Sequence, residues 1–211
     1  MLAEQEHQQR LTALLRRLLY EAQLPDPKSL AEFDWGAILD LDRAQIVQLA
    51  HDTGWLVRAE ILLLFGPSGV GQTHLAGGIS RSLIALDRSA RFFSATTLVQ
   101  ALQRAKAANA LAKALNRLDR FALLVIDDIS YVRRDEAETS VLFELVMDRY
   151  ERRSMLVTSN QPFNEWENVF STSAKTVAAV DRLVAHSTLI QINGESYRVK
   201  RARRAGGPAR C

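Results

Sequence analysis

The residues with the clearest chemical potential form a glycine-rich stretch, Gly66-Pro67-Ser68-Gly69-Val70-Gly71-Gln72-Thr73. Its spacing follows the G-x-x-x-x-G-[K]-[ST] pattern of phosphate-binding loops except at the lysine, where Gln72 stands. Glycines let successive backbone N–H groups turn inward around phosphate oxygens, and a helix beginning near Thr73 adds the positive end of its dipole. The Thr73 hydroxyl suits Mg²⁺. We therefore predict that residues 66–73, together with His74, bind a nucleotide.

Gln72 changes the chemistry expected of this loop. A lysine would place a positive charge near the β- and γ-phosphates, where negative charge develops during phosphoryl transfer. Glutamine has a similar reach and can donate hydrogen bonds, but it supplies no charge. Loss of such a contact typically costs about 2–4 kcal/mol of transition-state stabilisation. Some nucleotide binding is therefore expected to survive, whereas hydrolysis should suffer more.

Three later groups of polar residues complete the candidate chemistry. An apolar run over 121–126 ends in Asp127 and Asp128, so Asp127 is expected to hold Mg²⁺ and Asp128 to polarise the attacking water. The next apolar run ends at Asn160, which either orients that water or merely caps the strand. Arg182 follows Asp181 and could reach a neighbouring subunit's nucleotide as an arginine finger, although an ordinary surface helix is the better interpretation from the sequence.

Short apolar runs alternate with helical patterns downstream of residue 60. The apolar runs cover residues 61–65, 91–95, 121–126, 154–160 and 189–192, and the helical patterns cover 74–86, 97–118 and 136–153. Uninterrupted apolar runs are typical of strands buried on both faces, and their alternation with helices indicates a parallel sheet. The expected fold is α/β: a P-loop NTPase with three α/β/α layers and a mostly parallel sheet.

Two further helical patterns, at residues 4–23 and 42–51, precede the first strand. They flank a proline-containing break at 24–29. We therefore expect a short helical N-terminal extension over 1–56, an ATP-binding core over 57–200, and a basic, disordered tail over 201–211.

Composition narrows the class of protein. The net charge is +3, with arginines gathered near both ends of the chain. The single cysteine, Cys211, excludes an intramolecular disulfide. The N-terminus lacks a signal-peptide pattern, and no apolar run reaches membrane-spanning length. The expectation is a cytoplasmic protein without a membrane partner.

These motifs, in this order, resemble the IstB-like family of AAA+ proteins. Its members are ATP-binding helpers encoded beside an insertion-sequence transposase, and they are related to the DnaC helicase loaders and to DnaA. The resemblance covers about residues 10–200. It is carried by residues 21–25, 30–35, 60–76, 124–128, 158–160, 181–183 and 194–198.

The resemblance implies an AAA+ core without a separate lid, with ATP and Mg²⁺ as cofactors. It implies assembly as a homo-oligomer on duplex DNA and stimulation of the transposase of the same insertion element. Asp128, Asn160 and Arg182 would be the catalytic residues of an ATPase that Gln72 weakens or abolishes, with Thr73 and Asp127 at the metal. The family's N-terminal helical domain is longer than residues 1–56, so part of it is expected to be missing.

Two other functions stay open on these residues. A DnaC-like helicase loader would share nearly every motif. A scaffold that binds nucleotide or DNA without hydrolysis would account for Gln72. A small-molecule kinase is disfavoured, because the sequence shows no motif for an acceptor substrate.

Overall fold

The computed structural model describes residues 2–25, 29–38, 40–130, 136–161, 181–194 and 196. Five strands form one sheet in the order β2-β3-β4-β1-β5, and every neighbouring pair runs parallel. Their bounds are β1 Ile61–Phe65, β2 Ala90–Ser94, β3 Leu123–Asp127, β4 Ser154–Ser159 and β5 Ser187–Gln191. The expected tail over 201–211 lies outside the described residues.

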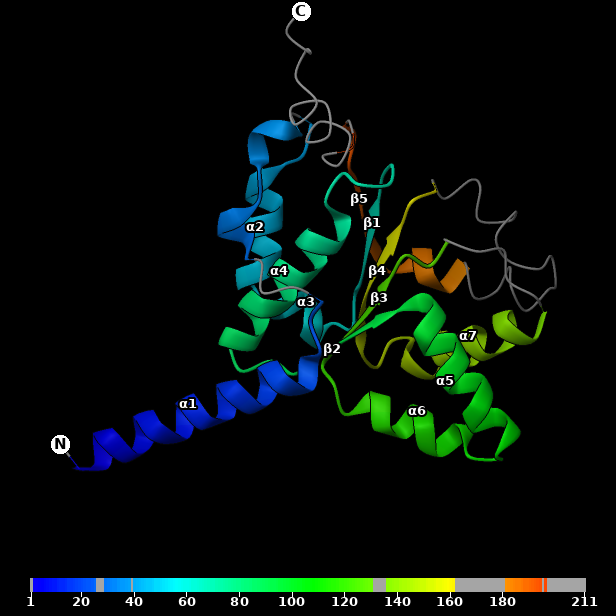
Figure 1. Ribbon diagram of the computed structural model, residues 1–211, viewed down its shortest axis with the longest axis horizontal. Coiled ribbons are helices and arrows are strands. Elements are labelled where there is room, and N and C mark those ends of the chain that lie inside the picture. Colours follow the sequence, from blue (N-terminus) through cyan, green and yellow to red (C-terminus); the bar gives the residue numbers. More distant parts are fainter. Residues whose placement is uncertain are drawn as a thin grey trace, which may run out of the picture.

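Helices cover both faces of this sheet, as Figure 1 shows. On one side lie α1 (Leu2–Ala22), α2 (Arg43–His51) and α4 (Gln72–Ala85). On the other lie α5 (Ala95–Ala107), α6 (Leu111–Asp119) and α7 (Glu136–Arg149). The short elements η1 (Leu30–Glu32), η2 (Trp35–Ala37) and α3 (Gly54–Val57) lie between α1 and β1 in the chain. The predicted three-layer α/β/α fold is confirmed.

Strand β1 shows how the sequence builds two core layers. All five of its residues are buried, and successive side chains of a strand point to opposite faces. Leu62 and Leu64 therefore join the apolar cluster beneath α2 and α4, whereas Leu63 joins the cluster beneath α5 and α7. Burial on both sides explains why this run shows no polar alternation.

Helix α1 packs on the body only near its C-terminal end and projects away from it (Figure 1). Leu18 and Ala22 are buried in the core, whereas residues 4–13 are exposed. Arg91 of β2 anchors the C-terminal end, because its Nη1 donates to the carbonyl oxygen of Glu21 at 2.6 Å. No helix among the described residues is long and apolar enough to cross a membrane.

The prediction of a single helix over 97–118 is wrong, because the structure has two helices, α5 and α6, which meet at a turn. Asn109 adopts the left-handed conformation with φ 52°. The N–H groups of Asn109 and Ala110 donate to the carbonyls of Lys106 and Ala105, at 3.0 and 2.8 Å. This is the hydrogen-bond pattern of a Schellman C-cap. The turn lets α6 bury Leu115 against the core, which a continuous helix would carry away from the sheet.

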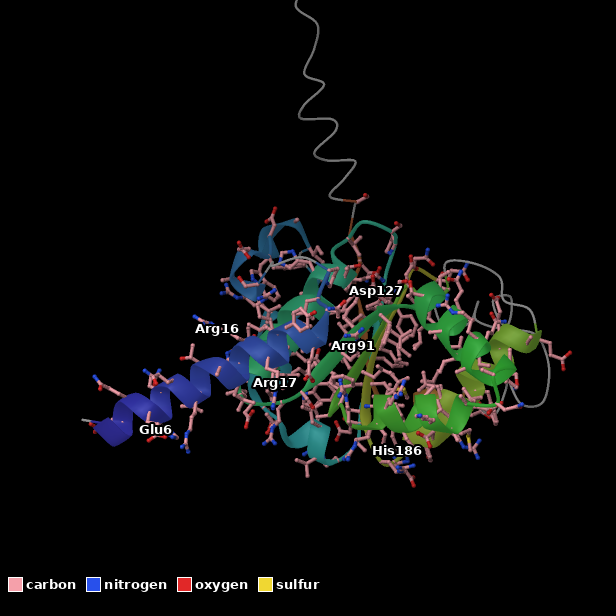
Figure 2. The ribbon with its side chains drawn as sticks, turned by 60° about the horizontal axis from the view of Figure 1, so that its bottom comes forward. Glu6, Arg16, Arg17, Arg91, Asp127 and His186 are labelled. Atoms are coloured by element: carbon pink, nitrogen blue, oxygen red, sulfur yellow. The ribbon has the colours of Figure 1, made fainter. Side chains whose placement is uncertain are left out.

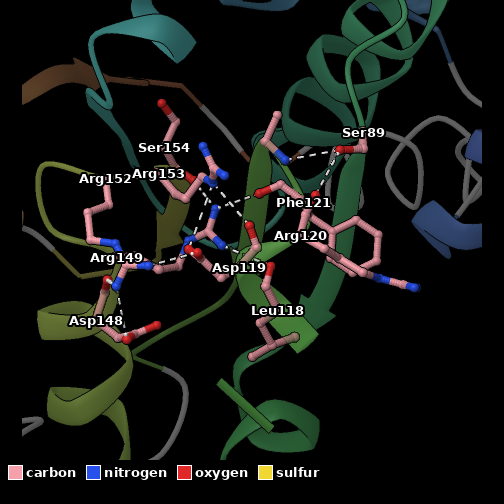
Figure 3. A network of polar contacts seen from close by, with 11 residues as sticks. Ser89, Leu118, Asp119, Arg120, Phe121, Asp148, Arg149, Arg152, Arg153 and Ser154 are labelled. Carbon is pink, nitrogen blue, oxygen red and sulfur yellow. Dashed lines mark hydrogen bonds and ion pairs between the residues drawn. The ribbon is translucent and has the colours of Figure 1, made fainter. Parts of the chain in front are cut away.

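Arg149, the last residue of α7, is fully buried and contacts residues that flank α6, β3 and β4 (Figure 3). Its guanidinium donates to the carbonyls of Leu118, Phe121 and Ser154 at 2.9–3.1 Å. Burial lowers the pKa of Arg149 to about 10, and the nearby Asp119 opposes that shift. Arg149 therefore stays a cation at neutral pH and ties α6, β3 and β4 together.

Candidate nucleotide-binding site

The predicted site residues gather at the edge of the sheet where the parallel strands end. The order β3-β4-β1 puts the end of β4 between the acids that end β3 and the glycine-rich loop that follows β1. Figure 2 shows Asp127 at this edge and His186, which directly precedes β5, at the opposite one. Ligand sites of open α/β sheets form outside the carboxyl ends of the strands.

The glycine-rich loop joins β1 to α4 and contains two left-handed glycines. Gly69 and Gly71 have φ angles of 88° and 101°, a conformation that costs other L-residues energy. A Cβ on Gly71 would lie 2.7 Å from the Phe33 ring, and one on Gly69 would collide with the Ser196 side chain. The loop is thus held between the segment ahead of β1 and the segment after β5.

The remaining loop residues divide into an anchored and an exposed part. The Gly66 N–H donates to the Ser159 carbonyl at 3.2 Å, and Val70 is buried. Pro67 and Ser68 are exposed at the tip. His74 lies one residue after Thr73, and its Nε2 is 2.8 Å from the Ser29 carbonyl oxygen. His74 therefore fastens the start of α4 to the N-terminal segment.

Thr73 and Asp127 meet across the site. The Thr73 Oγ1 donates to the Asp127 carboxylate, 3.1 and 3.0 Å from its two oxygens. Burial raises the pKa of Asp127, and hydrogen bonds from Thr158 and Thr73 partly oppose this. These two oxygen ligands suit Mg²⁺, which is usually held by one or two protein groups together with water and phosphate oxygens. No cluster of three or more His, Cys, Asp or Glu able to hold a metal occurs within the described part of the chain.

Thr158 organises both acids, a role that the sequence did not reveal. Its Oγ1 donates to Asp127 Oδ1 at 2.7 Å and accepts from the Asp128 N–H at 2.8 Å. Asp128 has a φ of 62°, so the chain turns sharply at the residue expected to polarise water. The signal available beforehand was a hydroxyl residue near the end of the strand beside the acids.

Ser130 similarly sets the orientation of Asn160. Its Oγ donates to Asn160 Oδ1 at 2.7 Å and accepts from the Asn160 N–H at 3.2 Å. Because Ser130 holds the amide oxygen, the plane of the Asn160 amide is defined and its NH₂ group points away from Ser130. Ser130, two residues after Asp128, was not singled out in the sequence.

Gln72 is buried at the start of α4, with its side chain turned to the protein backbone. Its Nε2 donates to the Gly66 carbonyl at 3.0 Å and to the Ser159 carbonyl at 2.5 Å. Two carbonyl acceptors identify the atom between them as the amide nitrogen. Gln72 therefore links the ends of β1 and β4.

Arg182 is the one predicted site residue that the fold keeps away from the others. It precedes β5, whose first residue pairs with the first residue of β1, at the edge opposite the glycine-rich loop. Its guanidinium lies over the Tyr150 ring at 5.8 Å from the ring centre. Within one chain, Arg182 cannot join Thr73 and Asp127.

This sheet order, with the glycine-rich loop after β1 and acids after β3, defines a P-loop protein of the AAA+ class. The crystal structure of the DnaC helicase loader superposes with a TM-score of 0.62 at 20% identity, over 75% of this chain and 97% of that one. AMPPCP-bound DnaA from Aquifex aeolicus gives 0.67 at 18% identity, over 87% of this chain and 56% of that one.

The chain belongs to the family of IstB-like ATP-binding proteins, whose family model matches residues 1–205. An insertion sequence ATP-binding protein of Sinorhizobium fredii (strain NBRC 101917 / NGR234) is 46% identical over 99% of this chain and 71% of its own length. The ATP-binding protein of insertion sequence IS21 from Pseudomonas aeruginosa is 35% identical, over 98% of this chain and 77% of its own length.

Proposed function

We propose that this protein is an ATP-binding helper of DNA transposition, which assembles on duplex DNA and stimulates the transposase of its own insertion element. Residues 57–200 form its nucleotide-binding core, residues 1–56 its N-terminal extension and residues 201–211 its basic tail. Its place of action is the cytoplasm. Family membership supports the ATP-binding role, and the names of the relatives support the association with insertion sequences.

The observation that carries the proposal is the contact between Thr73 and Asp127. A hydroxyl after the phosphate loop and a carboxylate at the end of a neighbouring strand are the two protein ligands that P-loop NTPases offer to Mg²⁺. When bound, Mg²⁺ neutralises charge on the phosphates. The backbone N–H groups of residues 69–73 would hold those phosphates at the N-terminus of α4.

Hydrolysis needs a water positioned beyond the terminal phosphate. We assign Asp128 to polarise that water and Asn160, oriented by Ser130, to align it. Arg182 would complete the site of a neighbouring subunit, since it lies at the opposite edge of its own chain. This assignment requires a homo-oligomer. Gln72 lacks the charge that a lysine would add, so hydrolysis is slow.

Duplex DNA is the proposed surface for assembly. Arg10, Arg16 and Arg17 lie on α1, which packs on the body only near its C-terminal end (Figure 1), and Figure 2 shows Arg16 and Arg17 in the C-terminal half of this helix. Arginine contacts to DNA phosphates are electrostatic and need no particular sequence. Glu6 pairs with Arg10, which leaves Arg16 and Arg17 as the stronger candidates.

The test compares ATP binding and hydrolysis for this chain and Gln72→Lys, with Mg²⁺ and with or without duplex DNA. Binding by both proteins, with hydrolysis faster in the lysine variant and stimulated by DNA, supports the proposal. Asp127→Asn is the matched control, since it should lose the gain that Mg²⁺ gives to binding. Absence of ATP binding in both proteins would refute the proposal.

A second candidate is a scaffold that binds nucleotide and DNA without turnover. This function is favoured by the position of the Gln72 amide, because its nitrogen is hydrogen-bonded to two backbone carbonyls rather than directed toward a phosphate. Its signature is ATP and DNA binding with no phosphate release, even with the cognate transposase present.

A further inference from the structure

The Gln72 side chain uses both of its donors within the protein. A primary amide carries two N–H hydrogens, and Nε2 lies within hydrogen-bond distance of the Gly66 and Ser159 carbonyls. The Ser159 carbonyl also accepts from the Gly66 N–H at 3.2 Å. Gln72 is therefore part of a small polar junction that holds the first residue of the phosphate loop against the end of β4.

This arrangement leaves Gln72 little to offer a phosphate. The remaining polar atom of its side chain is Oε1, which can only accept hydrogen bonds, as phosphate oxygens do. Turning the amide toward a ligand would break both bonds in a side chain that is only 9% exposed. The stronger hydrogen bonds to a charged phosphate would then be offset by the cost of leaving the Gly66 and Ser159 carbonyls without this donor.

A lysine at this position could contact the carbonyls and a phosphate at the same time. Its ammonium has three donors and a full charge, so it could keep two carbonyl contacts and still direct a charged N–H toward a phosphate. In a phosphate loop the backbone N–H groups cradle the α- and β-phosphates, whereas the lysine reaches the β- and γ-phosphates. The side chain at position 72 is thus the loop's own means of recognising a terminal phosphate.

We propose that Gln72 is a structural tie between β1 and β4 rather than a phosphate ligand, so that the site holds nucleoside diphosphate about as tightly as nucleoside triphosphate. The proposal rests on the proposed function, in that it takes the glycine-rich loop to bind an adenine nucleotide. ADP would then remain bound as readily as ATP, and the protein would be a nucleotide holder with weak discrimination between the two.

The test measures the dissociation constants of ATP and ADP by calorimetry on the full chain in EDTA. Mg²⁺ is withheld because it would neutralise phosphate charge and thereby discriminate between the nucleotides by itself. We expect the two constants to agree within about threefold, whereas Gln72→Lys should favour ATP by about tenfold or more, as expected of one charged hydrogen bond. Gln9→Lys, on the exposed part of α1, adds the same charge away from the loop and should leave the ratio unchanged.

A second measurement tests the tie without any nucleotide. Gln72→Met keeps the length of the side chain but removes the amide, so its Tm should fall by several degrees, as expected for the loss of two buried hydrogen bonds. An unchanged Tm in Gln72→Met would refute the tie. A tenfold preference of the natural chain for ATP in EDTA would refute the lack of discrimination while leaving the proposed function standing. If neither the natural chain nor Gln72→Lys binds nucleotide even after Mg²⁺ is restored, the proposed function fails and this inference fails with it.

Discussion

Replacing Thr158 with valine tests the hydroxyl that organises the two acids. The Thr158 side chain is 2% exposed, and valine has nearly the same shape. The change removes a hydrogen bond to the Asp127 carboxylate and leaves the Asp128 N–H without its acceptor. A hydrogen bond to a charged group contributes about 1.5–3 kcal/mol, and an unsatisfied buried donor costs about 1–3 kcal/mol.

Valine recovers part of this loss, because it buries a methyl group worth about 0.8 kcal/mol where the hydroxyl was. We therefore expect Thr158→Val to lower the free energy of unfolding by about 2–4 kcal/mol. For a chain of this size that corresponds to a fall in Tm of roughly 4–16 °C. Urea unfolding at pH 7, followed by circular dichroism, measures the difference directly.

Thr158→Ser is the matched control, because serine keeps the hydroxyl and loses only a methyl group. It should cost about 0.5–1.5 kcal/mol, which is the usual range for one buried methyl. If the valine variant were as stable as the unaltered protein, or if serine were the more damaging change, then packing rather than the hydroxyl would account for the stability that Thr158 contributes, and the role assigned to Thr158 would be wrong.

Three further changes probe other parts of the structure. Burial raises the pKa of Asp127 above its ordinary value of 3.8, so its carboxyl stabilises the fold when it is protonated, and that contribution is lost as the pH rises through the raised folded-state pKa. Asp127→Asn should therefore gain stability relative to the natural chain as the pH rises above about 4. Urea unfolding at several pH values measures this, and a difference independent of pH would contradict it. Arg149→Met removes the donor that the carbonyls of Leu118, Phe121 and Ser154 share, although the Leu118 carbonyl keeps the Phe121 N–H. It should lower the free energy of unfolding by about 3–5 kcal/mol, and Arg149→Lys should cost less. Denaturant titration of both variants checks the order. Asn109 has a φ of 52°, a left-handed conformation that glycine adopts more easily than asparagine and alanine less easily. Asn109→Gly should therefore stabilise the fold by about 0.5–1 kcal/mol, whereas Asn109→Ala should destabilise it. Equal melting temperatures for the two variants would argue against strain at this turn.

Much of the site could be predicted because its chemistry lies in short, contiguous segments. The glycine pattern at residues 66–71 needs left-handed backbone and close approach, which few other residues allow, and Gly69 and Gly71 have these conformations. The acids at 127 and 128 follow a run of residues buried on both faces, so the strand and its end were visible in the sequence. Local backbone conformation and burial can thus be predicted directly from the types of the residues.

Other features depended on which residues meet in space. Thr158 contacts Asp127 and Asp128, and Gln72 contacts Ser159, only because the sheet order puts β4 between β1 and β3. The same topology sends Arg182 to the opposite edge. The spacing of residues along the chain does not predict these pairings. Thr158 and Asp127 are 31 residues apart and Gln72 and Ser159 are 87 apart, and each pair meets because of the strand order and the direction of the side chains. The sequence by itself determined the loop, the acids and the α/β pattern, and tertiary structure decided how each polar group is partnered.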